Sequence, residues 1–343
     1  MNKITIKKPG LFTTIQDKGR WGYQQYGMTV AGSMDQFSMK VANLIVGNSE
    51  DEAVIESTFL GPEIEFGCDE IICITGANMK PLLNKKPVLM WTSVKVSAGD
   101  ILSFSGAVDG VRSYISFSRG LDVPVVMGSK STFLRGNLGG LNGGKLVAND
   151  EINLGDKKLS EYGSYLSRNF IPVYENIPAI RVIMGPQDDY FTDEAIDVFL
   201  NSTFQVTSES DRMGYRLEGP KIEHKSGADI ISDGIVFGSI QVPGHGSPII
   251  MMSDRQTTGG YTKIATVISS DLPILAQMGP GSKLNFKKIS LEESHILYKE
   301  QIENINQIQQ SLIKNRFEFS NERNLILSIG SSTFNVKVNE IEL

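Results

Sequence analysis

Residues 70–119 decide the fold, because they contain the runs IICITGA (71–77), PVLMW (87–91), VKVSAGD (94–100), ILSFSGA (101–107) and VRSYISFS (111–118). These short runs are rich in β-branched and aromatic residues, and Gly, Asn, Asp and Lys residues separate them. The pattern is typical of antiparallel strands joined by tight turns. The stretch therefore predicts a mainly β domain.

The two halves of the chain repeat the same short signals. GPEIEF begins at Gly61 and GPKIEH at Gly219, and each follows a candidate helix. Further along, GDILSF from Gly99 and GSKLNF from Gly281 each lead from a glycine turn into a candidate strand. A duplicated β-barrel is the simplest explanation of this internal similarity.

The length of the chain agrees with a duplication. Its 343 residues suffice for about two domains, and 40% hydrophobic with 21% charged residues is ordinary for a globular protein. The segment SEYGSYLSRNFIPVYENIP (160–178), rich in Ser, Asn and Pro, is the candidate linker. We therefore predict one β-barrel domain over residues 1–170 and a second over residues 171–343, which also carries a terminal helix and hairpin.

Helical signals occur only between the β runs. Asp35 is a candidate N-cap for a helix that Gly47 ends, and Thr192 is a candidate N-cap for a second helix. Ser290 and Glu293 form a capping box before a longer stretch with apolar residues every three or four positions. We expect a few short helices and one longer C-terminal helix, on the surface of the second domain.

Composition excludes several classes of partner. A net charge of −6 and a pI near 5.3 argue against a basic face for nucleic acid. No window reaches the ~18 apolar residues of a membrane span, and the start lacks the apolar core of a signal peptide. Cys68 and Cys73 have neither the spacing of a zinc site nor the density of a disulfide scaffold. We expect a cytoplasmic protein with two reduced thiols.

One glycine-rich segment resembles a nucleotide-binding loop in sequence. GGLNGGKL (139–146) matches most of a phosphate-binding loop, but Leu146 replaces the Ser or Thr that would hold magnesium. The residues that follow, LVANDEINL (146–154), alternate like a strand, whereas phosphate binding needs a helix N-terminus there. We therefore interpret the segment as a glycine-rich turn.

The histidines do not indicate a metal site. His224, His245 and His295 are too scattered for a zinc motif, and no serine lies in a GxSxG elbow. His245 differs from the other two because its flanking glycines in PGHGSP would let a ligand approach closely. We expect no metal and treat His245 as a candidate ligand-binding residue.

Three other segments concentrate hydrogen-bonding groups around glycines: FTTIQDKGRWGYQQYG (12–27), SESDRMGYRL (208–217) and SDRQTTGGY (253–261). Carboxylates can orient and activate a reacting group, and Arg offers a planar fork of hydrogen-bond donors to an anion. Glycine has no side chain to keep a substrate away. The alternative is that each segment holds an Asp–Arg pair that only fixes a loop.

The candidate catalytic residues are Asp17, Arg20, Asp211, Arg212 and Asp254. The candidate substrate-binding residues are Gln16, Tyr23, Arg216, Gln241, His245, Gln256, Thr257, Thr258 and Tyr261. A single catalytic site requires these segments to converge in space.

Several ordered motifs resemble one known family: TTIQDKGRWGYQQYGMTVAGSMD (13–35), ESTFLGPEIEF (56–66), SDRMGYRLEG (210–219), GSIQVPGHGSPIIMMSDRQTTGGY (238–261) and DLPILAQMGPG (271–281). The family is that of biotin-dependent carboxyltransferases, which contains the C subunit of 5-oxoprolinase, the KipA proteins and the second subunit of allophanate hydrolase. The resemblance implies two tandem cyclophilin-like β-barrel domains.

The resemblance also implies partners and an activity. It implies a component of an ATP-dependent 5-oxoprolinase, which opens 5-oxo-L-proline to L-glutamate. The partners would be the A and B subunits of that enzyme, of which B is KipI-like. ATP would be used by the assembled complex, and the Met-Lys pair in GANMKP lacks the flanking residues of a biotin-bearing segment. The alternatives are carboxyl transfer to urea or a related amide with a separate biotin carboxylase, and non-catalytic binding of a KipI-like inhibitor of a histidine kinase.

Overall fold

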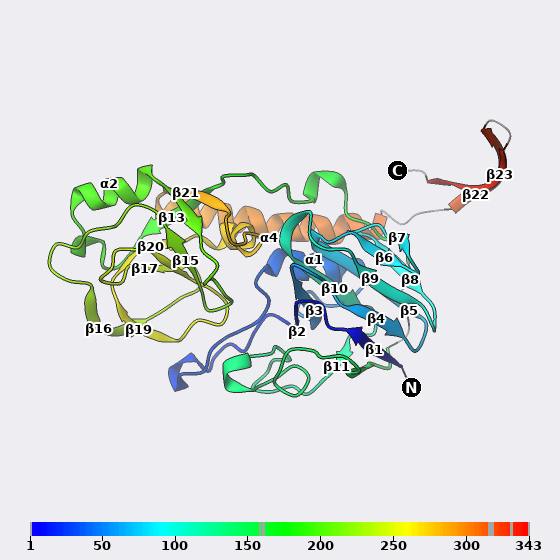
Figure 1. The fold of residues 1–343 in the computed structure, drawn as a ribbon, viewed down its shortest axis with the longest axis horizontal. Helices are drawn as coiled ribbons and strands as arrows, with labels where there is room; N and C mark the ends of the chain where they lie inside the picture. Colours follow the sequence, from blue (N-terminus) through cyan, green and yellow to red (C-terminus); the bar gives the residue numbers. More distant parts are fainter. Residues whose placement is uncertain (1, 158, 160–161, 315–318, 330–331, 342–343) are drawn as a thin grey trace.

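The structure is a computed structural model that describes residues 2–157, 159, 162–314, 319–329 and 332–341. Figure 1 shows two β-rich bodies side by side, with a long helix along one edge of the first. We call the body that contains β1 to β12 the first domain and the body that contains β13 to β21 the second domain. The mainly β fold predicted from the sequence is confirmed.

The first domain consists of two antiparallel sheets. The larger sheet has the order β11 (Leu121–Asp122), β12 (Glu151–Leu154), β1 (Lys3–Lys8), β4 (Glu63–Phe66), β9 (Ile101–Phe104), β6 (Pro81–Leu83) and β7 (Lys86–Pro87). The smaller sheet has the order β2 (Phe12–Gln16), β3 (Val54–Thr58), β10 (Asp109–Phe117), β5 (Glu70–Asn78) and β8 (Ser93–Val96). Alternate residues of both sheets, among them Ile6, Phe66, Ile74 and Phe117, are buried in one shared core.

The second domain is a closed barrel of seven strands. Its order is β13 (Ala179–Met184), β20 (Lys263–Val267), β17 (Ser239–Gln241), β18 (Ile249–Met251), β15 (Gly214–Glu218), β14 (Thr203–Val206) and β21 (Lys283–Lys288). The parallel pairing of β21 with β13 closes it. Phe199 and Phe286 stack at 4.4 Å between ring centroids in its core. A separate pair, β16 (Asp229–Gly234) with β19 (Thr258–Tyr261), lies outside the barrel sheet.

Four α-helices occur among the described residues: α1 (Gln36–Ile45), α2 (Asp193–Asn201), α3 (Leu272–Ala276) and α4 (Leu291–Lys314). The 3-10 turns are η1 (Gln24–Tyr26), η2 (Leu134–Gly136), η3 (Arg168–Phe170), η4 (Asp188–Tyr190) and η5 (Ser269–Asp271). Three predicted caps are confirmed, because Asp35, Thr192 and Ser290 each accept a hydrogen bond from a backbone N–H of the first turn.

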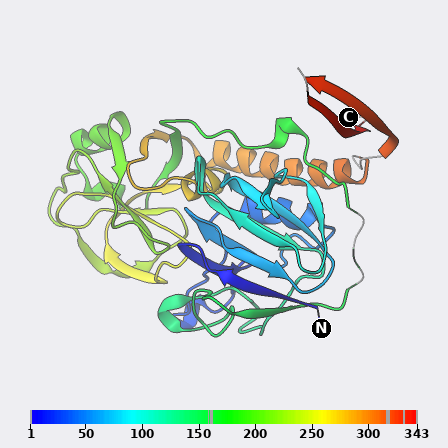
Figure 2. The same ribbon diagram turned by 45° about the vertical axis from the view of Figure 1, so that its right-hand side comes forward.

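The C-terminal helix packs on the first domain, although the sequence placed it on the second. Ile308 and Leu312 of α4 are buried in a cluster with Val41 and Ile45 of α1 and with Trp91. The hairpin of β22 (Phe319–Ile329) and β23 (Ser332–Ile341) follows α4, and Figures 1 and 2 show it beyond the end of that helix. Helix α4 therefore starts from the second domain and runs across the first.

The candidate linker has little regular structure in its described part. Between residues 162 and 178 the only helical turn is η3, and residues 160–161 lie outside the described residues. Leu166 in this segment is buried in the same cluster as Trp91. The domain boundary near residue 170 stays a prediction.

Gln277 connects the two domains at the end of α3. The ladder between β10 and β5 shifts register between Asp109 and Ser113, which frees the backbone N–H groups of Val111 and Arg112. The Oε1 of Gln277 accepts from these two N–H groups at 3.1 and 3.0 Å. Its Nε2 donates to the Oδ2 of Asp35 at 2.8 Å and to the carbonyl of Arg112 at 3.0 Å. One buried amide from the second domain thus satisfies groups on β10 and at the start of α1.

We expect Gln277→Ala to lower the free energy of unfolding by about 2–4 kcal/mol, because the N–H groups of Val111 and Arg112 lose their acceptor and the buried carboxylate of Asp35 loses one of its donors. Urea denaturation of the full chain measures the change. Gln309→Ala, on the exposed face of α4, is the matched control and should change stability by about 0.5 kcal/mol or less. An equal effect of both substitutions would show that Gln277 does not hold the domains together.

Candidate active site between the two domains

A loop of the first domain, residues 17–35, reaches into the second. Asp17 fixes its start: Oδ1 accepts from the N–H of Gly19 at 2.8 Å and the hydroxyl of Ser129 at 2.6 Å, and Oδ2 accepts from the N–H of Lys130 at 2.6 Å. Met34 at its far end is fully buried in the core of the second barrel. The loop therefore joins the two cores.

Two glycines allow the loop to fold back on itself. Gly19 and Gly32 have φ of 91° and 86°, in the region that favours glycine. A Cβ on Gly32 would lie 2.8 Å from the backbone nitrogen of Gly19. Hydrogen bonds join the outgoing and returning halves of the loop. They run from Arg20 N to the Val30 carbonyl and from Ser33 N to the Asp17 carbonyl, and both are 2.8 Å long.

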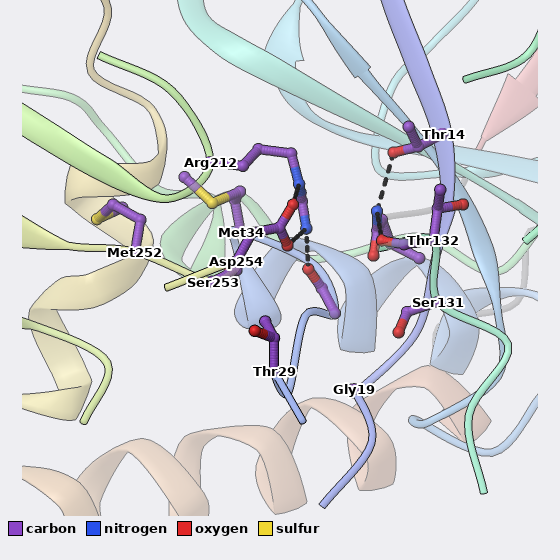
Figure 3. A network of polar contacts seen from close by, with 12 residues as sticks. Thr14, Gly19, Thr29, Met34, Ser131, Thr132, Arg212, Met252, Ser253 and Asp254 are labelled. Atoms are coloured by element: carbon purple, nitrogen blue, oxygen red, sulfur yellow. Dashed lines mark hydrogen bonds and ion pairs between the residues drawn. The ribbon is translucent and has the colours of Figure 1, made fainter. Parts of the chain in front are cut away.

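Arg212 lies between the domains and pairs with a carboxylate from each. Its Nε and Nη2 donate to Asp254 of the second domain at 3.1 and 2.9 Å, and its Nη1 donates to Glu56 on β3 of the first. Its Nη2 also donates to the carbonyl of Gly32 at 2.6 Å. Although burial alone would lower the pKa of Arg212, the carboxylates of Asp254 and Glu56 outweigh it and raise the pKa. Figure 3 shows Arg212 facing Asp254.

Arg20 is as buried as Arg212 but has few partners. It has no exposed surface, and its side chain makes one hydrogen bond to the described residues, from Nη2 to the carbonyl of Ser131. The Nε and Nη1 of Arg20 have no hydrogen-bond partner among the described residues. Burial lowers the pKa of Arg20, and the nearby carboxylates of Asp17 and Asp254 oppose that effect. Two nitrogens without a partner make this buried guanidinium a candidate anion-binding group.

Gln16 and Arg20 donate to the carbonyls of two consecutive residues, Thr132 and Ser131. The Nε2 of Gln16 donates to the hydroxyl of Thr14 at 3.0 Å and to the carbonyl of Thr132 at 3.2 Å, whereas its Oε1 has no partner in the described chain although it is buried. Figure 3 shows Thr14, Ser131 and Thr132 together across from Arg212 and Asp254. The Oε1 of Gln16 and the Nε and Nη1 of Arg20 are therefore an acceptor and two donors without a partner among the described residues.

The structure brings part of the predicted site together. Asp254 influences the pKa of Arg20, Thr29 donates to the carbonyl of Arg255 at 3.1 Å, and Ser253 donates to the carbonyl of Ser33 at 3.2 Å, so the first-domain loop contacts the segment that begins at residue 253. The predicted residues that converge there are Gln16, Asp17, Arg20, Arg212 and Asp254. Their catalytic and binding roles stay predictions.

A second group of predicted residues lies at the β16–β19 pair. Gln241 is buried on β17 and donates weakly to the Tyr261 carbonyl at 3.4 Å. Thr258 and Tyr261 lie on β19 with exposed side chains. Gln256 is exposed and Thr257 is half-buried just before the strand. This group follows directly after Asp254 in the chain, but its side chains make no hydrogen bond or ion pair with Arg20 in the part of the chain that the structure describes.

The remaining predicted residues form no hydrogen bond or ion pair with the side chains of Arg20, Arg212 or Asp254 among the described residues. Asp211 is exposed and accepts at Oδ1 from the N–H groups of Met213 and Gly214, at 2.8 and 3.2 Å, which fixes a turn. Arg216 is exposed near Glu209, and His245 is exposed in its glycine loop, where Nδ1 accepts from Ser247 N at 3.2 Å. Tyr23 is half-buried and precedes η1.

Sequence reasoning missed three buried charged residues at the interface. Glu56 lies on β3, whose five residues are all buried. A carboxylate within a run of strand residues is a sequence signal that could have identified Glu56 as a buried, paired charge. Arg112 is buried on β10. Arg255 is buried beside Phe237 and donates only to carbonyl groups of the described chain, and burial lowers its pKa to about 10.

Other site types find little support in the described chain. Its potential ligand side chains form no group of three or more that could hold a metal ion. The glycine-rich segment 139–146 leads to β12, a strand, as predicted. None of the helices in the described ranges is long and apolar enough to cross a membrane.

Comparisons with known proteins place these features in a family. Residues 26–288 match the family model "Carboxyltransferase domain, subdomain A and B". The chain is 36% identical to the C subunit of 5-oxoprolinase from Escherichia coli (strain K12) over 291 residues, which cover 85% of this chain and 93% of that protein. It is also 36% identical to the corresponding 5-oxoprolinase protein of Haemophilus influenzae, over 82% of this chain and 89% of that protein.

A solved structure shows the same fold. The K. lactis urea amidolyase superposes with a TM-score of 0.85 and 28% sequence identity. The superposition covers 99% of this chain but only 22% of that much longer protein. Because the family match spans both domains and most of the loop that joins them, this chain belongs to the carboxyltransferase domain family with subdomains A and B.

Proposed function

We propose that this chain is the C subunit of an ATP-dependent 5-oxoprolinase, which opens 5-oxo-L-proline to L-glutamate together with the A and B subunits. The observation that carries the proposal is the 36% identity to two proteins that bear the name of this 5-oxoprolinase component, over 93% and 89% of their lengths. Membership of the chain in the carboxyltransferase family rests on the family model and does not depend on this identity.

The interface network suits chemistry at an amide. A lactam reacts poorly because the nitrogen lone pair is delocalised into the carbonyl, so a site must polarise the amide and hold an anion beside it. The Nε and Nη1 of Arg20 are free to donate to a carboxylate, a phosphate or a developing oxyanion. The free Oε1 of Gln16 can accept from an amide N–H. We assign these two residues to substrate recognition.

In this proposal ATP is consumed by the assembled complex, and neither a metal nor biotin is attached to this chain. The glycine-rich segment 139–146 lacks the helix that a phosphate-binding loop requires.

A second candidate is carboxyl transfer to urea or a related amide. The TM-score of 0.85 with the K. lactis urea amidolyase favours it, and it would need a separate biotin carboxylase as a partner. Both activities act on an amide, so the same network would serve either of them.

We expect the chain purified with the A and B subunits to release glutamate from 5-oxoproline only when ATP is present, and to be inactive alone. Glutamate is measured by an enzyme-coupled assay. The control replaces 5-oxoproline by urea, bicarbonate and a biotin carboxylase. Absence of ATP-dependent glutamate release from a correctly assembled complex would reject the proposal, and consumption of urea in the control would support the second candidate.

The same substitution at two buried arginines separates stability from activity. Arg212→Met should lower the free energy of unfolding by about 3–5 kcal/mol, because Glu56 and Asp254 are left unpaired. Arg20→Met should leave stability unchanged or raise it by up to about 2 kcal/mol, because that charge is buried without an ion-pair partner among the described residues. Turnover of the complex that contains Arg20→Met should fall about 100-fold.

Arg135→Met is the control for both variants, because Arg135 is exposed and should affect neither quantity. A strong loss of stability in Arg20→Met, with activity lost only in proportion to misfolding, would show that Arg20 fixes a loop and does not bind substrate.

A further inference from the structure

A cavity of about 240 Å³ lies between the two domains and is lined in part by Arg212, which also belongs to the site described above. Its apolar wall contains Phe12 and Phe59 of the first domain and Val206 and Met278 of the second, and its polar wall contains Arg112 and Arg212. The volume lies just below the roughly 300–1,000 Å³ of pockets for drug-sized ligands, so it suits a smaller molecule.

Arg112 is a buried cation on the wall of this cavity, and it forms no direct ion pair with a described residue. The side chain is 5% exposed, and its Nη1 donates to the hydroxyl of Tyr215 at 2.5 Å and to the carbonyl of Ala276 at 2.6 Å. Both partners are neutral, its Nε has no partner, and it forms no ion pair with any described residue. Arg212, on the same wall, is neutralised by Glu56 and Asp254. Although burial lowers the pKa of Arg112, Tyr215 and the carboxylate of Glu56 outweigh that effect and raise it, so the side chain stays charged. No described carboxylate contacts Arg112 directly, and a bound anion would supply the partner that its Nε lacks.

The geometry of the cavity limits what that anion can be. Tyr215 accepts from Arg112 and donates to the carbonyl of Met278 at 3.0 Å, so its hydroxyl holds the guanidinium in place. The one carboxylate in the lining, that of Asp211, is engaged with the backbone N–H groups of Met213 and Gly214. Because most of the lining is apolar, a hydrated inorganic ion would lose more solvation than the site returns.

We propose that this cavity binds a small organic carboxylate with a compact apolar body, whose carboxylate accepts from Arg112 while its body packs against Phe12, Phe59 and Met278. The identity of the natural ligand rests on the proposed function, under which 5-oxoproline, a carboxylate on a five-membered ring, is the molecule that fits. The cavity itself selects only the class of ligand.

Calorimetric titration of the full chain with three related compounds tests the inference. The compounds are 5-oxoproline, cyclopentanecarboxylate, which keeps the ring and the carboxylate but lacks the lactam, and 2-pyrrolidinone, which keeps the lactam but lacks the carboxylate. We expect both carboxylates to bind about 10- to 100-fold more tightly than 2-pyrrolidinone, the scale of one charged hydrogen bond.

Two variants locate the binding. Arg112→Met should weaken both carboxylates to the level of 2-pyrrolidinone. Ser208→Trp should block the mouth of the cavity without loss of stability, because Ser208 is exposed and lines the cavity, and it remains informative if Arg112→Met folds poorly. Ser226→Trp, also exposed but outside the lining, should bind like the unaltered chain.

Equal binding of the three compounds, no binding of either carboxylate, or unchanged affinity in Ser208→Trp would each overturn the inference. Binding of cyclopentanecarboxylate by a chain whose assembled complex releases no glutamate would keep the inference and reject the proposed function. Glutamate release by a complex in which Ser208→Trp changes neither ligand binding nor KM would reject the inference and keep the proposed function.

Discussion

The arrangement of the two domains depends on the guanidinium of Arg212, which is held between Glu56 of one domain and Asp254 of the other. A buried cation is tolerated only when opposite charges and acceptors satisfy it, and here two carboxylates and the carbonyl of Gly32 do so. Because these partners come from both domains, the domains must dock in one orientation. Gln277 adds a second fixed contact through the N–H groups of β10.

This docking creates an interior with an unusual charge distribution. The chain is acidic overall, with a net charge of −6, yet the region around the interface buries Arg20, Arg112, Arg212 and Arg255. Of these, only Arg212 pairs with a carboxylate among the described residues. Arg112 also joins the domains by donating to Tyr215 and to the carbonyl of Ala276, and Arg255 donates to the carbonyls of Ile235 and Met252. Anion binding gives a further reason to bury Arg20 and Arg112, whose side chains keep nitrogens without a partner among the described residues, and natural proteins accept such costs at functional sites.

The sequence predicted what depends on local patterns. The strands of residues 70–119 and the caps Asp35, Thr192 and Ser290 follow from side-chain period and from hydrogen bonds to the next turn, so neighbouring residues suffice to find them. The converging part of the candidate site was also in the predicted set, because Asp, Arg and Gln around glycine are unusual between strands.

The contacts that build the interface could not be predicted in the same way. Glu56 and Arg212 are 156 positions apart, and Arg112 and Gln277 are 165 apart, so no local pattern relates them. The surface on which α4 packs was missed for the same reason, because the partners of Ile308 lie on α1. Exposed residues such as His245 and Arg216 share the composition of the buried cluster, and sequence alone does not tell which of them face inward.

We infer that the chemistry of this chain takes place between its two domains. The most direct test is an experimental structure of the chain in complex with the A and B subunits, 5-oxoproline and a non-hydrolysable ATP analogue. We predict a ligand that contacts residues of both domains and whose anionic group lies within hydrogen-bond distance of the free nitrogens of Arg20 or Arg112. A ligand bound outside the interface, with both guanidinium groups unchanged, would contradict this inference.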